Sequence, residues 1–343
     1  PHQDTRRDRA VRLCIDNAQL EIAPPHSRGE ESQVECSAAL HEKFTFLLSY
    51  TLAGREHRMI LPPMGRRQAL KLGLAAAVTQ MASAAQSKHR ILYFTRSVGF
   101  EHSVVKRQGS ELSHSEKILT EMCGKAGYEV ECTKDGRVFD DGLSRYDLLA
   151  FYTTGDLTHP DNYGNPPMSA QGKRKLLDAI AAGKGFVGFH SATDTFHAPG
   201  PGIDPYINMI GGEFLTHGKQ QEASLLLTSK FPGAGNLGMA EGISFFEEWY
   251  AMKNFAPDLH VIFVQETKLM QGEAYQRPDF PASWARMHGQ GRVFYTSLGH
   301  REDVWTNPFF QTIAMGGIRW ALGEVSYDVK PNTRQVTPLA DQL

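Results

Sequence analysis

Apolar runs and helical patterns alternate through residues 89–189. Compact apolar segments, each of the length of one strand, lie at 89–96, 128–135, 146–154 and 185–189. Between them, apolar positions at helical spacing favour helices over about 110–126 and 169–185. Nearly continuous apolar strands joined by crossover helices are typical of parallel sheets. This part of the chain therefore predicts a mostly parallel sheet with helices on both faces.

The pattern changes after residue 220. Strand-like segments without intervening helices lie at 222–229, 243–252, 259–266 and 281–288. We therefore expect an antiparallel extension of the sheet between about residues 222 and 290. A buried strand at 291–300 and a helix at 308–322 complete one α/β domain of flavodoxin-like architecture, residues 86–323. The tail, 324–343, has few core-forming residues, and we expect it to be loosely held.

Residues 1–85 differ in character from this domain. Residues 1–63 show no sustained periodicity, and we interpret them as a non-native or disordered leader. Residues 64–85 carry an arginine pair, then a modest apolar run, and then the small residues Ala82-Ser83-Ala84. That order is typical of a twin-arginine secretion signal. The sequence thus predicts an exported, periplasmic protein.

Composition narrows the range of partners. Lys and Arg number 36 and Asp and Glu 38 among 343 residues, so the formal net charge is −2. This balance favours neither nucleic acid nor an anionic membrane surface as a partner. No apolar run is long enough to span a bilayer. With 4 cysteines, the chain has too few for a disulfide scaffold.

Polar side chains follow the predicted parallel strands, at the edge where open α/β sheets bind ligands. They are His102 after the first strand, Thr154 and Asp156 after the third, His190 and Ser191 after the fourth, and His300 and Glu302 after the last. His190 stands at a sharp turn of the kind that mounts a nucleophile in hydrolases. Imidazole titrates near neutral pH and suits acid–base catalysis. We predict catalytic roles for His190, His300 and Glu302, and substrate binding by the others.

Residues 211–250 add further candidates for substrate binding. His217 follows paired glycines, which allow a close approach of the backbone. Glu247 and Glu248 interrupt an apolar strand, and only one can face the site because successive strand residues point to opposite faces. We select Glu248. Trp249, like Phe100 and Trp284, offers a flat ring for stacking on a sugar, with core packing as the alternative role.

Several familiar catalytic motifs are missing from the sequence. It contains no G-x-S-x-G, no paired C-x-x-C, no P-loop and no dinucleotide fingerprint. The segment GAGNLG, 233–238, lies between predicted antiparallel strands and therefore lacks the context of a phosphate-binding loop. An esterase or amidase using Ser191 beside His300 remains an alternative, although Ser191 lies one residue past the turn.

In their order along the chain, these segments resemble the ThuA-like (trehalose-utilisation) family of the class I glutamine-amidotransferase-like superfamily. The matching segments are VGFEH (98–102), GFVGFHSATD (185–194), GGEFLTH (211–217), EEWY (247–250), GRVFYTSLGH (291–300) and IRWALG (318–323). In amidotransferases the turn carries a catalytic cysteine, and a later His-x-Glu completes a triad. Here His190 occupies the turn, and neither Cys123 nor Cys132 lies there, so we do not expect thiol-dependent glutamine hydrolysis.

The resemblance implies a role in carbohydrate metabolism. The implied substrate is a 3-keto glycoside or disaccharide, with the sugar dehydrogenase that forms it as a pathway partner. A ketone at C3 acidifies the hydrogens at C2 and C4, so we expect acid–base isomerisation, elimination or hydrolysis by histidine. A divalent metal is an alternative source of catalysis, and its ligand-capable candidates are His102, His190, His300 and Glu248. A metal-assisted hydrolase and a non-catalytic sugar-binding module both stay open.

Overall fold

The computed structural model describes residues 89–234 and 242–343 with their side chains, together with the backbone of the strands between residues 11 and 61. The chain divides into two units, Pro1–Gln86 and Ser87–Leu343. The predicted secretion signal, 64–85, lies outside the described residues.

The first unit contains a 5-stranded sheet in the order β2-β1-β3-β4-β5. Its strands are β1 Val11–Ile15, β2 Ala18–Ile22, β3 Val34–Ala39, β4 Thr45–Leu52 and β5 Arg55–Leu61. Regular structure was not expected in this part of the sequence. The segments TFLLSYTL and REHRMIL are rich in strand-forming residues but lack clean alternation, so periodicity missed them. That the mature protein lacks residues 1–84 remains a prediction.

The second unit is built on a 9-stranded sheet in the order β12-β11-β14-β15-β16-β9-β8-β6-β7. Its parallel half consists of β6 Arg90–Phe94, β7 Glu129–Thr133, β8 Leu148–Phe151, β9 Gly185–Phe189 and β16 Gly291–Thr296. Neighbouring strands of this half all pair in parallel. Every residue of β8 and β9 is buried, as a sheet covered on both faces requires. The predicted α/β fold is confirmed.

The other half of this sheet is antiparallel, as the sequence predicted. It consists of β11 Gln221–Leu227, β12 Gly242–Glu247, β14 His260–Gln265 and β15 Phe280–His288. The single strand expected over 243–252 is in fact two strands. β12 ends at Glu247, and β13, Tyr250–Lys253, pairs instead with β10, Glu213–His217, in a separate 2-stranded sheet. Glu248 and Trp249 form the break between them.

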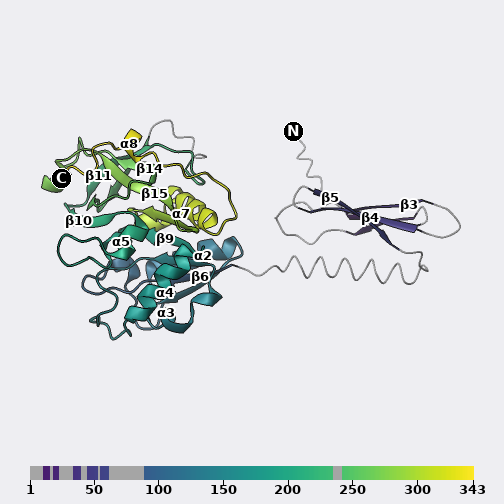
Figure 1. Ribbon diagram of the computed structural model, residues 1–343, viewed down its shortest axis with the longest axis horizontal. Helices are drawn as coiled ribbons and strands as arrows, with labels where there is room; N and C mark the ends of the chain where they lie inside the picture. The colour runs from purple at the N-terminus through teal and green to yellow at the C-terminus, as the bar shows by residue number, and fades with distance from the viewer. Residues whose placement is uncertain are drawn as a thin grey trace, which may run out of the picture. The chain divides into compact units, whose positions relative to one another are not determined.

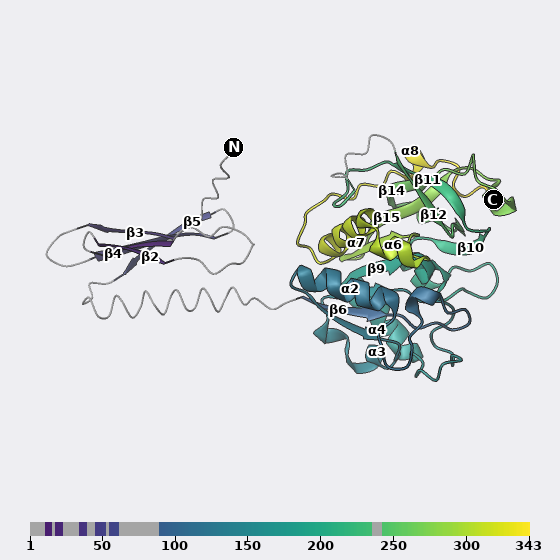
Figure 2. The same cartoon turned by 180° about the vertical axis from the view of Figure 1, so that it is seen from behind.

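Helices cover both faces of the larger sheet, and successive strand residues supply two cores. Leu119 of α2 His114–Lys125 and Ile313 of α7 Pro308–Ala321 pack in the core that contains Tyr93. Leu176 of α4 Ala170–Ala181 packs in the core that contains Phe94. Figure 1 and Figure 2 show these helices around the sheet from opposite sides. The shorter helices are α3 Val138–Asp141, α5 Pro205–Ile210, α6 Glu302–Thr306, α8 Thr333–Val336, and the 3-10 turns η1 Ser103–Val105, η2 Leu143–Arg145, η3 His190–Asp194 and η4 Glu273–Tyr275.

The C-terminal tail is held against β14, so the expectation that it is loosely held is wrong. The Asn332 side chain accepts from the backbone N–H of Val261 at 2.6 Å and donates to its carbonyl at 3.0 Å. His260 Nδ1 lies 2.7 Å from the carbonyl oxygen of Lys330. Ala340 is buried in the core. These contacts between side chains and backbone groups need few apolar residues. The composition of the tail therefore did not indicate that it is held in place.

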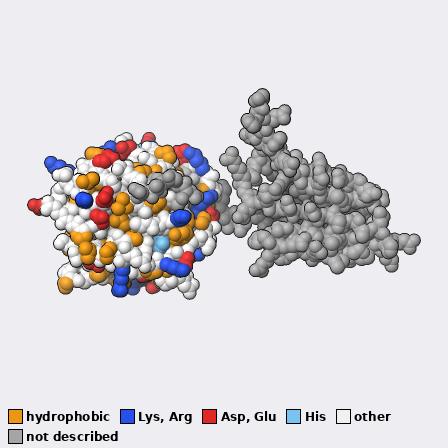
Figure 3. Space-filling view, turned by 90° about the horizontal axis from the view of Figure 1, so that it is seen from above, with side chains coloured by type: hydrophobic (Ala, Val, Ile, Leu, Met, Phe, Trp, Pro, Cys, Tyr) orange, Lys and Arg blue, Asp and Glu red, His pale blue; other side chains and the backbone are white. Residues whose placement is uncertain are grey.

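Acidic and basic side chains are interspersed on the face of the domain seen in Figure 3. That face therefore presents no continuous surface of one charge. Among the described residues, no helix has both the length and the apolar character needed to cross a membrane.

Candidate metal centre

Three histidines meet at the carboxyl edge of the parallel strands. His102 follows β6, His190 follows β9 and His300 follows β16. The centroid of the His102 ring lies 5.1 Å from that of His190 and 5.3 Å from that of His300, and the His190 and His300 centroids are 5.3 Å apart. The sequence placed each of these residues at a strand end, and the sheet order brings them together.

The backbone at His190 is held in an unusual conformation. Its φ is +39°, in the left-handed region that residues with a Cβ seldom adopt. The side chain is fully buried, and its Nδ1 lies 2.7 Å from the carbonyl oxygen of Ser297. Because a carbonyl only accepts, Nδ1 carries the proton and donates it. The lone pair is therefore on Nε2, which faces the cluster.

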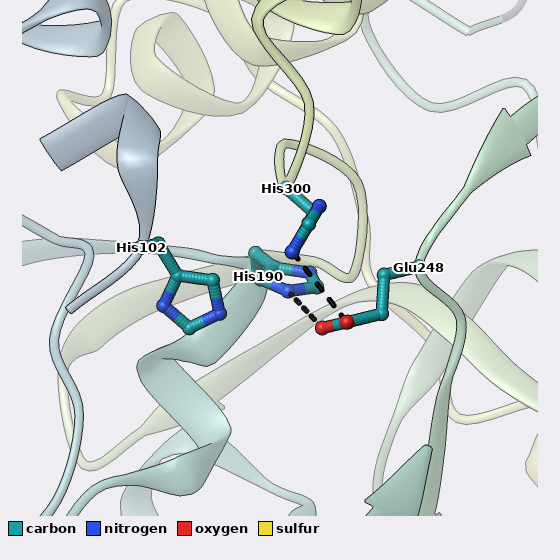
Figure 4. A group of neighbouring side chains, drawn as sticks. All are labelled: His102, His190, Glu248 and His300. Atoms are coloured by element: carbon teal, nitrogen blue, oxygen red, sulfur yellow. Dashed lines mark ion pairs between the residues drawn. The ribbon is translucent and has the colours of Figure 1, made fainter. Parts of the chain in front are cut away.

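Glu248 supplies the carboxylate of the cluster from the break between β12 and β13. Its Oε2 lies 3.5 Å from Nε2 of His190, and its Oε1 lies 3.5 Å from Nε2 of His300. The side chain is 13% exposed. Figure 4 shows the carboxylate directed toward both imidazoles, with His102 on the other side of His190. His217 Nδ1 lies 3.4 Å from Oε1, but this imidazole is 46% exposed and lies at the margin.

The donor atoms fit a divalent cation. One ligand atom from each of His102, His190, Glu248 and His300 lies within 4.8 Å of all the others. In a tetrahedral zinc site with bonds of about 2.0–2.1 Å, ligand atoms lie about 3.4 Å apart. The two carboxylate–imidazole separations of 3.5 Å are already close to that value. Three imidazoles and one carboxylate suit Zn²⁺ and other first-row divalent ions.

Burial keeps the imidazoles neutral. It lowers the pKa of His102 to about 2, with His190 and His300 adding to the effect. It also lowers the pKa of His190 to about 3, and it lowers the pKa of His300 to about 4, with the neighbouring His190 adding to the effect. Neutral imidazoles have the free lone pair that a metal ligand needs.

Glu247, the neighbour of Glu248, is not one of the four clustered ligand candidates. It is fully buried, and burial raises its pKa to about 8. Its Oε1 accepts from the backbone N–H of Glu248 at 3.2 Å and from that of His300 at 3.0 Å. Glu247 thus ties together the two segments that carry Glu248 and His300.

Two residues predicted from the sequence do not take the expected positions. Glu302 begins α6, where a hydrogen bond from Ser103 lowers its pKa. The carboxylate within ion-pair distance of His300 is Glu248 and not Glu302. Trp249 is fully buried and donates to the carbonyl of Gln221 at 2.9 Å, so its ring is not available for stacking on a ligand. The break after β12 turns this side chain into the core.

The remaining predicted residues follow β8 and β9. Thr154 and Ser191 are buried at the same edge, and their hydroxyls have no hydrogen-bond partner among the described residues. Asp156 lies in the following loop and pairs with His159 at 3.0 Å. The sequence reasoning missed Tyr250, whose ring centroid is 4.1 Å from that of His190 and whose hydroxyl is 3.4 Å from Nε2 of His102. The sequence signal that could have indicated Tyr250 is its position two residues after Glu248, because alternate residues of an extended chain face the same side.

Comparison with known proteins identifies the family and supports the fold. Residues 90–321 match the family model described as ThuA, trehalose utilisation. A crystal structure of a ThuA-like protein from Parabacteroides merdae aligns with a TM-score of 0.51 and 18% identity, covering 71% of this chain and 93% of that one. A second, from Bacteroides uniformis, aligns with a TM-score of 0.50 and 16% identity, covering 69% and 93%. No curated protein matches significantly. The chain therefore belongs to the ThuA (trehalose-utilisation) family.

Proposed function

We propose that the chain is a metal-dependent enzyme that acts on a 3-keto glycoside or disaccharide. The observation that carries this proposal is the convergence of His102, His190, Glu248 and His300, whose donor atoms lie within 4.8 Å of one another. These side chains come from four separate segments of the chain. The family description, trehalose utilisation, supports a sugar as the substrate.

The reaction we propose starts at the carbon beside the ketone. His102, His190, Glu248 and His300 would hold a divalent cation, which would supply Lewis-acid polarisation of the C3 carbonyl and so acidify the hydrogen at C2. When the C2–H bond breaks, its electron pair forms the C1–C2 double bond, and the bond from C1 to the glycosidic oxygen breaks. The proton ends on that oxygen, so the products are an unsaturated keto sugar and a free alcohol. No oxidant or reductant is consumed.

His217 is the residue best placed to carry the proton. Its Nδ1 lies 3.4 Å from Glu248 Oε1, and the side chain is 46% exposed, in contrast to the buried His102 and His190. A substrate at the cluster therefore has access to this imidazole. Positioned acid–base groups contribute about 10²–10⁴-fold to a rate.

The test is turnover of 3-keto-trehalose and 3-keto-glucosides by protein freed of metal and then supplied with Zn²⁺ or Mn²⁺, with the products identified by NMR. We expect release of glucose from 3-keto-trehalose, and of the aglycone alcohol from a 3-keto-glucoside, only with metal present. We expect H217A to bind metal normally but to turn over at least ~10²-fold more slowly. Binding without turnover by the metal-loaded protein would instead support a non-catalytic sugar-binding module.

A further inference from the structure

Phe100 is unusually exposed for an aromatic residue beside a buried cluster. Phe100 is 65% accessible, whereas the side chain of the next residue, Glu101, is 7% accessible and His102 is buried. An exposed phenylalanine gains little from the hydrophobic effect in the folded protein. Single exposed apolar residues are common, so exposure alone does not indicate that Phe100 binds a ligand. Its position in the structure must support that role as well.

The loop that carries Phe100 is fixed on both sides of it. Glu101 Oε1 lies 3.1 Å from Lys134 Nζ, and this pair is buried. Lys134 Nζ also donates to the carbonyl of Thr95 at 2.7 Å. On the other side, Gly99 has a φ of +106°, a conformation that glycine adopts readily. Because Glu101 is anchored inward and Gly99 turns the chain, the Phe100 side chain is directed outward.

Phe100 borders the candidate metal centre. Its ring centroid is 4.9 Å from that of His102, with the planes at 89°. His102 in turn lies within 5.3 Å of both His190 and His300, centroid to centroid. The other two aromatic rings considered from the sequence, Trp249 and Trp284, are fully buried. Among these three, only Phe100 can reach a ligand.

We propose that Phe100 is a stacking platform for the pyranose ring of a glycoside whose reacting carbons lie at the metal centre. The C–H bonds on one face of a pyranose are its apolar side, and they match the negative face of an aromatic ring. Binding sites of small ligands combine such apolar surfaces with a few polar groups that fix orientation. This inference rests on the proposed function, because it requires a sugar at the site.

The experiment compares wild type, F100A and F100W with L269A, which removes a side chain that is 78% exposed and far from the loop in sequence. Calorimetry measures the affinity for methyl 3-keto-glucoside, kinetics give kcat and KM, and metal content checks that the centre is intact. We expect F100A to bind the sugar about 10-fold more weakly, with a raised KM, unchanged kcat and full metal content. F100W and L269A should match wild type.

Equal sugar affinity in F100A and wild type would overturn the platform while leaving the proposed function standing. Failure of wild type to bind any keto glycoside would overturn both. Loss of metal from F100A would contradict the inference in a third way, since it would make Phe100 a support for His102 and not a contact for the sugar.

Discussion

Glu247 is the position where a single change tests how the candidate metal centre is held in place. Its Oε1 accepts backbone N–H groups from Glu248 and His300 at 3.2 and 3.0 Å. In E247A both donors lose their partner, at about 1–3 kcal/mol each. We expect the free energy of unfolding to fall by about 2–6 kcal/mol. E247Q keeps an oxygen at the same position, so we expect it to lose less than about 1 kcal/mol.

The same change should weaken cation binding. Partners that orient metal ligands typically contribute 10–100-fold to affinity, and E247A should lose about that much. The assay is competition for Zn²⁺ with a chelator of known affinity, combined with urea unfolding. E213A is the matched control, because Glu213 is also buried but binds His197 and Asn254. It should lower stability and leave cation affinity unchanged. Wild-type affinity in E247A, or equal losses in E247A and E247Q, would refute this reasoning.

Three further predictions concern other parts of the chain. Changing His190 or His300 to Ala should lower turnover by at least ~10²-fold, and the double variant should be little worse than the poorer single variant, because the two act as one unit. His197 is held by Asp194 at 2.6 Å, a contact that raises its pKa. Its contribution to stability should be complete below its unfolded pKa and should vanish as pH rises through the folded pKa, whereas urea unfolding of H197A should lack this loss. If residues 64–85 are an export signal, N-terminal sequencing of the exported protein should find no residue before 59, and a chain from Gln86 should melt cooperatively.

The fold was predictable because its signals are local. Continuous apolar runs of this length, such as LLAF and GFVGF, are typical of strands covered on both faces, and their crossover helices have clear ends. The carboxyl edge of such a sheet is a fixed place, so His102, His190 and His300 could be assigned to it without a structure.

The carboxylate of the site was harder to predict from the sequence than the histidines, because its position depends on where a strand breaks. Glu247 and Glu248 are adjacent, and the strand pattern alone gives them opposite directions without saying which faces the histidines. The chain leaves the larger sheet after Glu247 and enters a second one at Tyr250. That transition depends on tertiary packing, which also buries Trp249. The analogy with a His-x-Glu pair similarly pointed to Glu302, where the contact is in fact made by Glu248.

Titration of metal-free protein with Co²⁺, followed by visible absorption, tests the central claim most directly. We expect one saturable site per chain with the spectrum of nitrogen and oxygen coordination. H102A, H190A, H300A and E248A should each weaken binding strongly, while H159A, which changes an imidazole that is 69% exposed, should not. Absence of a saturable site in wild type, or a site unaffected by all four changes, would show that these residues do not form a metal centre.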